Sequence, residues 1–294
     1  MKRIITSFCA VLMSIIMLGS LSQQGFAVGS APVAENLELK TYKNVSVGGL
    51  LSAYDPDGDV VNFEITTNPV KGEIEVSEDG SFVYTPRENK KGRDYFGYKA
   101  VDSQGNYSQE ATVIIRIEKQ KTDVKYSDLS GKAEEYAAVE LAEQGIFVGE
   151  QIGGEYCFYP DKTVSRGEFL AMSMLVSDEP VVSAVMSMGI ENENMPEWLR
   201  EYACTAMLNG YDKNYDWSLG IDRSEAAAML DSNLNTTKVS YISYEAGLSE
   251  EVAQACANLS ACGIIKEGEP LFDNLTRSDA AQMLAKSLQL KENR

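Results

Sequence analysis

The feature that most constrains this chain is a helix-start motif that occurs three times in its C-terminal half. The three segments are VSRGEFLAM, IDRSEAAAML and LTRSDAAQML. Their arginines, Arg166, Arg223 and Arg277, are separated by 57 and 54 residues. Each arginine follows a residue of helix-capping type and is followed two residues later by an acid. The capping residues are Ser165, Asp222 and Thr276, and the acids are Glu168, Glu225 and Asp279.

Each motif also has the same context upstream. A segment with helical periodicity ends near Gly or Asn-Gly in AEQGIFVG, AMLNGYD and SACGIIKEG, and a loop then leads to the capped helix. The repeated unit is therefore helix, Gly-containing loop and capped helix. One such unit cannot bury its apolar face alone, so we expect the three units to share one core.

The position of the arginines needs an explanation. A cation in the first turn faces the positive end of the helix dipole, which costs roughly 0.3–1 kcal/mol when it is exposed. The cation is favourable if an anion binds there, because free N–H groups and a planar guanidinium both suit a carboxylate. The alternative is structural: each arginine pairs with a neighbouring acid or lays its stem over the core.

The helical half resembles three S-layer homology (SLH) repeats, at residues 125–179, 180–237 and 238–290. The first repeat shows YSDL, EYAAVELAEQGIFVG, CFYPD and VSRGEF; the second shows PEWLREYACTAMLNGYD and IDRSEA; the third shows EEVAQACANLSACGIIKEG, PLFDN and LTRSDA. The resemblance implies an all-α, pseudo-threefold bundle that holds exported proteins on Gram-positive-type cell walls. Its grooves would bind a secondary wall polysaccharide that often carries a pyruvate ketal.

The resemblance also implies which residues bind the glycan. Arg166, Arg223 and Arg277 match the arginine that contacts the acidic sugar, and Asp128 matches the early aspartate of the first repeat. Tyr136 and Trp198 occupy the tryptophan position of the family, where they would flank sugar rings or pack in the core. The later repeats depart from the pattern: the early aspartate falls on Asn192 and then on Tyr244 or Glu245, Val252 replaces the tryptophan, and the second repeat lacks a clear F-x-P. We therefore expect one groove to be weak or lost.

Residues 31–118 have a different texture, and residues 119–124 form a polar linker to the repeats. The segments VNFEITTN, GEIEVSE, GSFVYTPR, DYFGYKAVD and EATVIIRIEK alternate apolar and polar residues between turn signals, which predicts an antiparallel β-sandwich. The order of DPDGD, GSFVYTP and DYFGYKAVDSQG resembles bacterial cadherin-like and Ig-like modules. Such modules are spacers or adhesive surfaces, and some bind calcium.

The acidic residues of this module suggest a possible calcium site. Asp55, Asp57, Asp59 and Asp102 could supply the oxygen ligands that Ca²⁺ prefers. The stretch is not an EF-hand, because its glycine, Gly58, is fourth rather than sixth and the twelfth position is a threonine. The alternative is an acidic turn with the glycine at its tight position.

The N-terminus and the composition indicate the compartment. Residues 1–27 combine a basic start, the apolar stretch IITSFCAVLMSIIMLG and small residues before a cleavage point after Ala27, which predicts a secretory signal peptide and no membrane insertion once it is removed. A net charge of −18 argues against binding nucleic acid through the overall field. The chain has no histidine, which removes Ser/His and Cys/His catalytic arrangements. Four cysteines remain outside the leader, Cys157, Cys204, Cys256 and Cys262; we expect them to be buried thiols, with one disulfide left open.

Three functions compete at this point. The first is a surface protein anchored non-covalently to wall polysaccharide by its repeats and displaying one β module. The second is an adhesion or assembly protein whose β module binds another surface protein or a carbohydrate, with the repeats as a tether. The third, an enzyme such as a wall hydrolase, is disfavoured because the signal, the β module and the repeats leave no stretch for a catalytic domain. No cofactor is required by the first two functions, apart from the calcium considered above.

Overall fold

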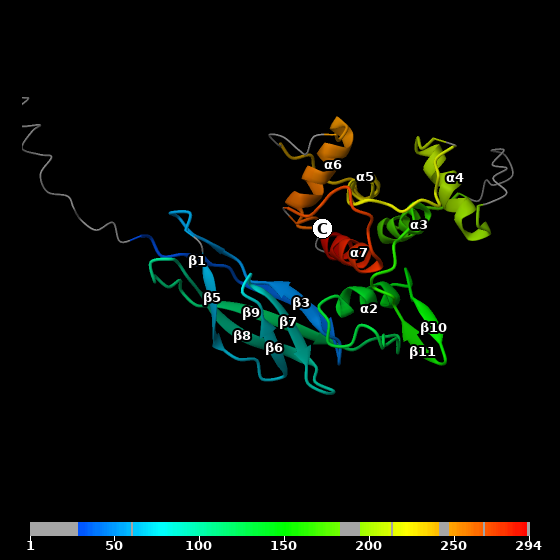
Figure 1. Cartoon of the computed structure of the whole chain (residues 1–294). Coiled ribbons are helices and arrows are strands. Elements are labelled where there is room, and N and C mark those ends of the chain that lie inside the picture. Colours follow the sequence, from blue (N-terminus) through cyan, green and yellow to red (C-terminus); the bar gives the residue numbers. More distant parts are fainter. Residues whose placement is uncertain are drawn as a thin grey trace, which may run out of the picture.

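The computed structural model describes residues 29–59, 61–182, 195–212, 214–240, 247–266 and 268–292. In these ranges a β-sheet domain precedes a region of six α-helices (Figure 1). The predicted signal peptide, residues 1–27, lies outside the described residues, as do Asn192, Tyr244 and Glu245. Among the residues described, no helix is long and apolar enough to cross a membrane.

The β domain has two facing sheets. One sheet has the strand order β2-β9-β8-β5, the other has the order β3-β7-β6, and β1 pairs with β4. The strands are β1 (Val33–Ala34), β2 (Leu37–Tyr42), β3 (Val47–Leu50), β4 (Ala53–Tyr54), β5 (Asn62–Thr67), β6 (Gly72–Val76), β7 (Ser81–Pro86), β8 (Gly92–Val101) and β9 (Ala111–Glu118). All pairs are antiparallel except β2 with β9, which are parallel.

The alternation of the strands explains the core between the sheets. Phe82 and Tyr84 of β7 and Phe96 and Tyr98 of β8 are almost fully buried because they point to the same side of their strands. The rings of Phe82 and Phe96 meet edge to face with centroids 5.2 Å apart. The five predicted strand segments correspond to β5–β9; the first four strands were not predicted, because glycines interrupt the alternation in VGGL.

Each repeat contributes two helices to the helical region. The first helices are α2, α4 and α6, and the second helices are α3, α5 and α7. The helices are α2 (Glu135–Glu143), α3 (Arg166–Ser177), α4 (Arg200–Leu208, after the 3₁₀ turn η1, Glu197–Leu199), α5 (Arg223–Leu234), α6 (Glu250–Ala261) and α7 (Arg277–Glu292). A short hairpin, β10 (Glu150–Ile152) with β11 (Glu155–Cys157), lies between α2 and α3. The six helices confirm that this region is mainly helical, whereas the hairpin corrects the prediction that it is all-α.

The first helices all end in the same way. Gly145, Gly210 and Gly263 each lie two residues beyond the helix with a positive φ of 69°, 104° and 70°. The residue after each glycine donates its N–H to a carbonyl five residues earlier, which is the Schellman pattern. This left-handed conformation explains why each repeat has glycine at this position.

Three loops before the second helices close a ring at the centre of the helical region. The N–H of Val164 donates to Leu275 (3.0 Å), that of Leu275 donates to Ile221 (2.8 Å), and that of Ile221 donates to Val164 (3.0 Å). All three side chains are buried. One residue of each repeat therefore bonds to both other repeats.

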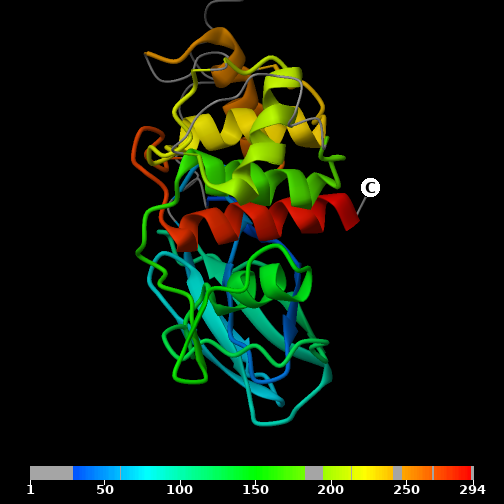
Figure 2. The ribbon, with the colours of Figure 1, turned by 90° about the vertical axis from the view of Figure 1, so that its right-hand side faces the viewer.

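The helices pack between repeats rather than within them. The first helix of each repeat lies against the second helix of another: α4 on α3, α6 on α5, and α2 on α7. In Figure 2 the long helix α7 runs between α2 and α3, which it contacts. The contact of α2 with α7 joins the first repeat to the third. Each repeat therefore packs on another, and none is an independent packing unit.

The β domain is joined to the first repeat by polar and aromatic contacts. Tyr42 of β2 stacks on Tyr136 of α2 with ring centroids 5.9 Å apart, and its hydroxyl donates to Glu140 at 2.8 Å. Lys40 lies 3.4 Å from the same carboxylate. Residues 119–124 have no helix or strand, and the N–H groups of two of them donate to the Glu143 carboxylate. The predicted linker is thus held against α2.

Candidate functional site

The three motif arginines begin α3, α5 and α7, as predicted. Two of them pair with the motif acid of the following repeat: Arg166 donates to Glu225 through Nε (3.0 Å) and Nη2, and Arg223 Nη2 donates to Asp279 at 3.1 Å. Arg277 Nη2 instead donates to Glu150 of β10, at 3.1 Å. The ion pairs connect the repeats around the same cycle as the backbone ring.

Arg277 pairs with Glu150 and not with the remaining motif acid, Glu168, which takes part in the cap of α3. The Glu168 carboxylate accepts from the N–H of Ser165 (2.8 Å) and from its hydroxyl (2.9 Å), while the hydroxyl accepts from the Glu168 N–H. This reciprocal arrangement is the predicted capping box.

The first-turn N–H groups are bonded within the protein, which corrects the expectation that they are free for an anion. The N–H groups of Arg166 and Gly167 donate to Leu219 and Trp217, both at 2.9 Å. Those of Arg277 and Ser278 donate to Lys162 (2.8 Å) and Pro160 (3.0 Å). The neighbouring repeat thus supplies the acceptors, and an anion at these positions would have to be bound by the guanidinium groups.

Arg277 lies in the wall of a cavity of about 440 Å³. The cavity is enclosed by the loop after α2, the second helices of repeats one and three, and the start of the second repeat. Its lining residues include Phe147, Phe158, Glu168, Met172, Leu175, Trp198, Tyr202 and Arg277. An apolar, aromatic pocket with a few polar groups is the usual form of a small-ligand site. We call it the Arg277 groove.

The guanidinium in this groove is held in one orientation. Nη1 of Arg277 donates to the carbonyl of Phe158 at 3.0 Å, and the guanidinium carbon lies 5.0 Å from the centroid of the Phe147 ring. Its carboxylate partner, Glu150, is exposed and is also 3.2 Å from Lys162. Hydrogen bonds from Lys162 and Arg277 lower the pKa of Glu150, which is therefore ionised at neutral pH.

Asp128, the early aspartate of the first repeat, acts on the loop behind this groove. Its carboxylate accepts from the N–H of Phe158 (3.0 and 3.1 Å) and from that of Tyr159 (2.7 Å). Tyr159 has a φ of 56°, a left-handed value that is costly for a bulky residue. Asp128 thus fixes the turn that presents the Phe158 carbonyl to Arg277.

The site around Arg166 is richer in aromatic rings. The guanidinium carbon lies 4.8 Å from the centroid of the Tyr215 ring, and Tyr215 packs on Tyr211 and Trp217. The Glu225 carboxylate raises the pKa of Arg166, so the guanidinium stays charged at every accessible pH. The side chain of Arg166 is 20% exposed, more than those of the other two arginines at 8%.

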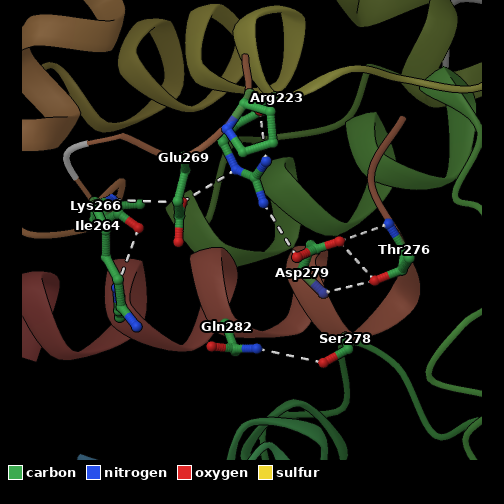
Figure 3. Close-up of polar contacts among 10 residues, drawn as sticks. Arg223, Ile264, Lys266, Glu269, Thr276, Ser278, Asp279 and Gln282 are labelled. Carbon is green, nitrogen blue, oxygen red and sulfur yellow. Dashed lines mark hydrogen bonds and ion pairs between the residues drawn. The ribbon is translucent and has the colours of Figure 1, made fainter. Parts of the chain in front are cut away.

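Arg223 is the most enclosed of the three (Figure 3). Nη1 donates to the carbonyl of Pro270 at 2.7 Å, Nε lies 3.2 Å from Glu269, and Nη2 reaches Asp279. Asp279 also accepts from the N–H and hydroxyl of Thr276, so its two oxygens serve the cap and the arginine separately. Two carboxylates and a carbonyl around one guanidinium make this a structural position in the unliganded protein.

The two aromatic candidates lie in different environments. Trp198 is 52% exposed and borders the Arg277 groove. Tyr136 is buried and stacks on Tyr42 of the β domain. It therefore packs in the core, which was the alternative to flanking a sugar ring. Sequence reasoning missed Phe147, Glu150 and Tyr215 as parts of the arginine sites. The quoted segment AEQGIFVG contains Phe147 and ends just before Glu150, but nothing in it indicates an inter-repeat contact.

The aspartates of the β domain form turns in the structure. One oxygen of Asp55 accepts from the N–H groups of Asp57 (2.8 Å) and Asp59 (3.1 Å), and Asp102 accepts from those of Gln104 and Asn106 (both 2.8 Å). Within the described ranges, no three carboxylate, cysteine or histidine side chains are grouped to hold a metal ion. Calcium binding stays a prediction, and the turn geometry is that of its alternative.

The expectation of buried thiols holds for two of the four cysteines, whereas Cys157 and Cys262 are only partly buried. All four are free thiols; Cys204 and Cys256 are buried, and burial raises the pKa of Cys256 to about 11. A thiol with a raised pKa is a poor nucleophile, so the two buried cysteines, Cys204 and Cys256, serve packing.

Comparison with known proteins identifies the N-terminal domain. Residues 29–119 match the bacterial cadherin-like domain family. This domain is cadherin-like. The match confirms the predicted β module, whereas the SLH resemblance of residues 125–290 stays a prediction. A search among curated proteins finds no match.

Several solved structures share a low similarity with part of the chain. An endo-fucoidan hydrolase of glycoside hydrolase family 107 is 19% identical with a TM-score of 0.26, over 34% of this chain and 15% of that one. A mutant of the SrpA adhesin from Streptococcus sanguinis is 19% identical with a TM-score of 0.25, over 33% and 65%. A SusE-like surface located polysaccharide binding protein from Bacteroides thetaiotaomicron is 17% identical with a TM-score of 0.23, over 31% and 15%. This chain thus spans less than two thirds of the length of each.

Proposed function

We propose that this protein is an exported cell-surface protein that binds an acidic secondary wall polysaccharide through its helical repeats and displays one cadherin-like domain. The observation that carries the proposal is the Arg277 groove, where a fixed guanidinium, an exposed tryptophan and an apolar wall face one cavity. The threefold repetition of the arginines and the SLH resemblance support the same function. No catalytic step is part of the proposal.

The groove suggests how an acidic sugar would be bound. Glu150, the present partner of Arg277, has a side chain that is 44% exposed, whereas the arginine side chain is 8% exposed. A carboxylate of the polysaccharide would replace this more exposed acid and keep the charge-assisted bonds to the guanidinium. The exposed face of Trp198 would cover a sugar ring, and the apolar wall suits the methyl group of a pyruvate ketal.

The repeats differ in their fitness for this role. The Arg166 site has aromatic rings and a partly exposed guanidinium, but its bidentate bond to Glu225 must be broken for a ligand to bind. At the Arg223 site two carboxylates already pair with the guanidinium, so a ligand carboxylate cannot replace a single protein acid there. We therefore assign the main binding site to Arg277, a secondary one to Arg166, and a structural role to Arg223.

One observation favours adhesion through the β domain as a second function. Tyr95, on the outward face of the four-stranded sheet, is 47% exposed. Tyr107, in the segment between β8 and β9, is 49% exposed, and its hydroxyl donates to Glu64 of β5. Exposed tyrosines are enriched where proteins bind partners. In this case the repeats would tether the chain while the sheet binds another surface protein or a carbohydrate.

Cosedimentation with cell walls tests the anchoring function. The purified protein is expected to sediment with native walls and to stay in the supernatant with walls stripped of their acidic polymer. Trp198→Ala should lower the bound fraction, because it removes an exposed wall of the groove at little cost in stability. Tyr54→Ala, which removes an exposed ring from the β domain outside the tyrosines discussed above, is the matched control. Equal binding of native and stripped walls, or an equal effect of the two variants, would refute the assignment.

A further inference from the structure

A second cavity, of about 660 Å³, lies between the β domain and the helical region. Strands β2, β3 and β7 form one side of it, and the start of α2, the end of α6 and the outer face of α7 form the other. Its lining residues include Leu39, Val47, Leu50, Phe82, Tyr136, Ile265, Lys40, Lys266 and Lys286. The volume is within the roughly 300–1,000 Å³ that is typical of small-ligand sites. We call it the interdomain cavity.

The charge of the interdomain cavity is opposite to that of the whole chain. Among the residues that the structure describes, three lysines line it and no acid does, although the chain has a net charge of −18. Lys40 is engaged by Glu140 at 3.4 Å and by Glu292 at 3.7 Å. The positive charge that faces the cavity therefore comes from Lys266 and Lys286.

These two lysines are held near each other at the end of α6. The Nζ of Lys286 donates to the carbonyl of Ile264 at 3.3 Å, which places it one turn of chain from Lys266. Burial lowers the pKa of Lys286, and the charge of Lys266 lowers it further. Glu269, an acid close to Lys266, forms an ion pair with Arg223 (Figure 3). An additional anion would relieve the repulsion between the two ammonium groups.

The remaining wall of the cavity is aliphatic and aromatic. Leu39, Val47, Leu50 and Phe82 come from the open side of the sandwich, and Leu50 is 47% exposed. Ser77, Ser81, Gln282 and Gln289 add hydrogen-bonding groups at the rim. A highly charged ligand would leave the apolar wall unused, and an uncharged apolar ligand would make no use of the charge of the two lysines.

We propose that the interdomain cavity binds an amphiphilic anion, a small molecule with an apolar body and one carboxylate, sulfonate or phosphate group. The anionic group pairs with Lys266 and Lys286, and the apolar body covers Leu50 and Phe82. The site is separate from the Arg277 groove, so its occupancy does not depend on wall binding.

Fluorescence titration with 8-anilinonaphthalene-1-sulfonate, an amphiphilic anion, tests this site in the full chain. The probe should bind with enhanced emission, decanoate should displace it, and decanol, which has the same chain length without the charge, should not. Lys266→Gln/Lys286→Gln should weaken probe binding about tenfold or more, the effect of losing a charge-assisted contact. Lys90→Gln/Lys91→Gln, two exposed lysines of the β7–β8 loop, is the charge-matched control and should bind as the wild type does.

A second pair of variants separates the cavity from non-specific apolar binding. Leu50→Glu places a negative charge in the cavity wall, and Leu50→Gln makes a change of the same size without the charge. Because this side chain is half exposed, neither variant needs the fold to change. The glutamate should weaken probe binding severalfold more than the glutamine. Equal binding by both, displacement by decanol, or an equal loss in the control lysine pair would overturn the proposal.

Discussion

The Nη2 atom of Arg223 lies 3.1 Å from Oδ1 of Asp279, so the arginine that begins the second motif is held by the acid of the third. The same relationship joins Arg166 to Glu225, one repeat earlier. A recurring Arg-x-acid motif in one chain thus becomes a set of bonds between repeats. The motif stabilises the assembly of the repeats before any ligand binds.

Arg223→Gln should destabilise the helical region. The guanidinium is 8% exposed and contacts Asp279, Glu269 and the Pro270 carbonyl. Its loss leaves two acids without their cation, and we expect a decrease of about 2–3 kcal/mol in the free energy of unfolding. Urea unfolding followed by helical circular dichroism measures it. Arg200→Gln, at the start of α4, should change it little; equal losses would show that the inter-repeat pair is not special.

Removal of the third repeat should unfold more helix than it deletes. A chain that ends at residue 237 lacks α7, against which α2 packs, and α6, against which α5 packs. Both remaining helices then expose apolar faces, and short isolated helices are marginal in water. The helical circular dichroism signal should fall by more than the share of α6 and α7. A proportional loss would mean that each repeat folds by itself.

The contact between the β domain and α2 should weaken in acid. Burial by itself raises the pKa of Glu140, but hydrogen bonds from Gln144 and Tyr42 and the charge of Lys40 outweigh it, and the pKa is lowered. A lowered pKa in the folded state means that the ionised carboxylate stabilises the fold above its usual pKa. This stability is lost as the pH falls through the folded pKa.

Glu140→Gln tests this linkage. We expect the variant to lose roughly 1–3 kcal/mol at pH 7, because Lys40 and Tyr42 lose their charged acceptor. The difference from the wild type should shrink as the pH falls and vanish once the carboxyl is protonated. Unfolding in urea at several pH values measures it, and a pH-independent difference would contradict the assigned cause.

Much of the fold could be predicted from the sequence because it is encoded locally. Apolar alternation identified β5–β9, and the caps identified the starts of α3 and α5 at their first residues. The interfaces were not predictable in this way. Nothing near Tyr136 indicates that it stacks on Tyr42, and nothing near Arg277 indicates Glu150, because both partners are brought together only by the tertiary fold.

Glu150→Gln should strengthen binding to the acidic wall polymer. The substitution removes the carboxylate that competes with a ligand for Arg277, while Nη1 stays bonded to the Phe158 carbonyl. We expect a severalfold lower dissociation constant in a titration with purified polymer, and no change for Glu155→Gln in the neighbouring strand β11. Weaker binding in Glu150→Gln would show that this acid is part of the site rather than a substitute for the ligand.

Tryptophan fluorescence tests the central claim most directly. The chain has two tryptophans, and Trp217 is buried whereas Trp198 borders the Arg277 groove. Trp217→Phe therefore leaves a single reporter in the groove. Purified acidic wall polymer should shift its emission to the blue and protect it from acrylamide quenching, and polymer stripped of its acidic groups should do neither. Unchanged emission and quenching while the protein still sediments with native walls would contradict binding in the Arg277 groove.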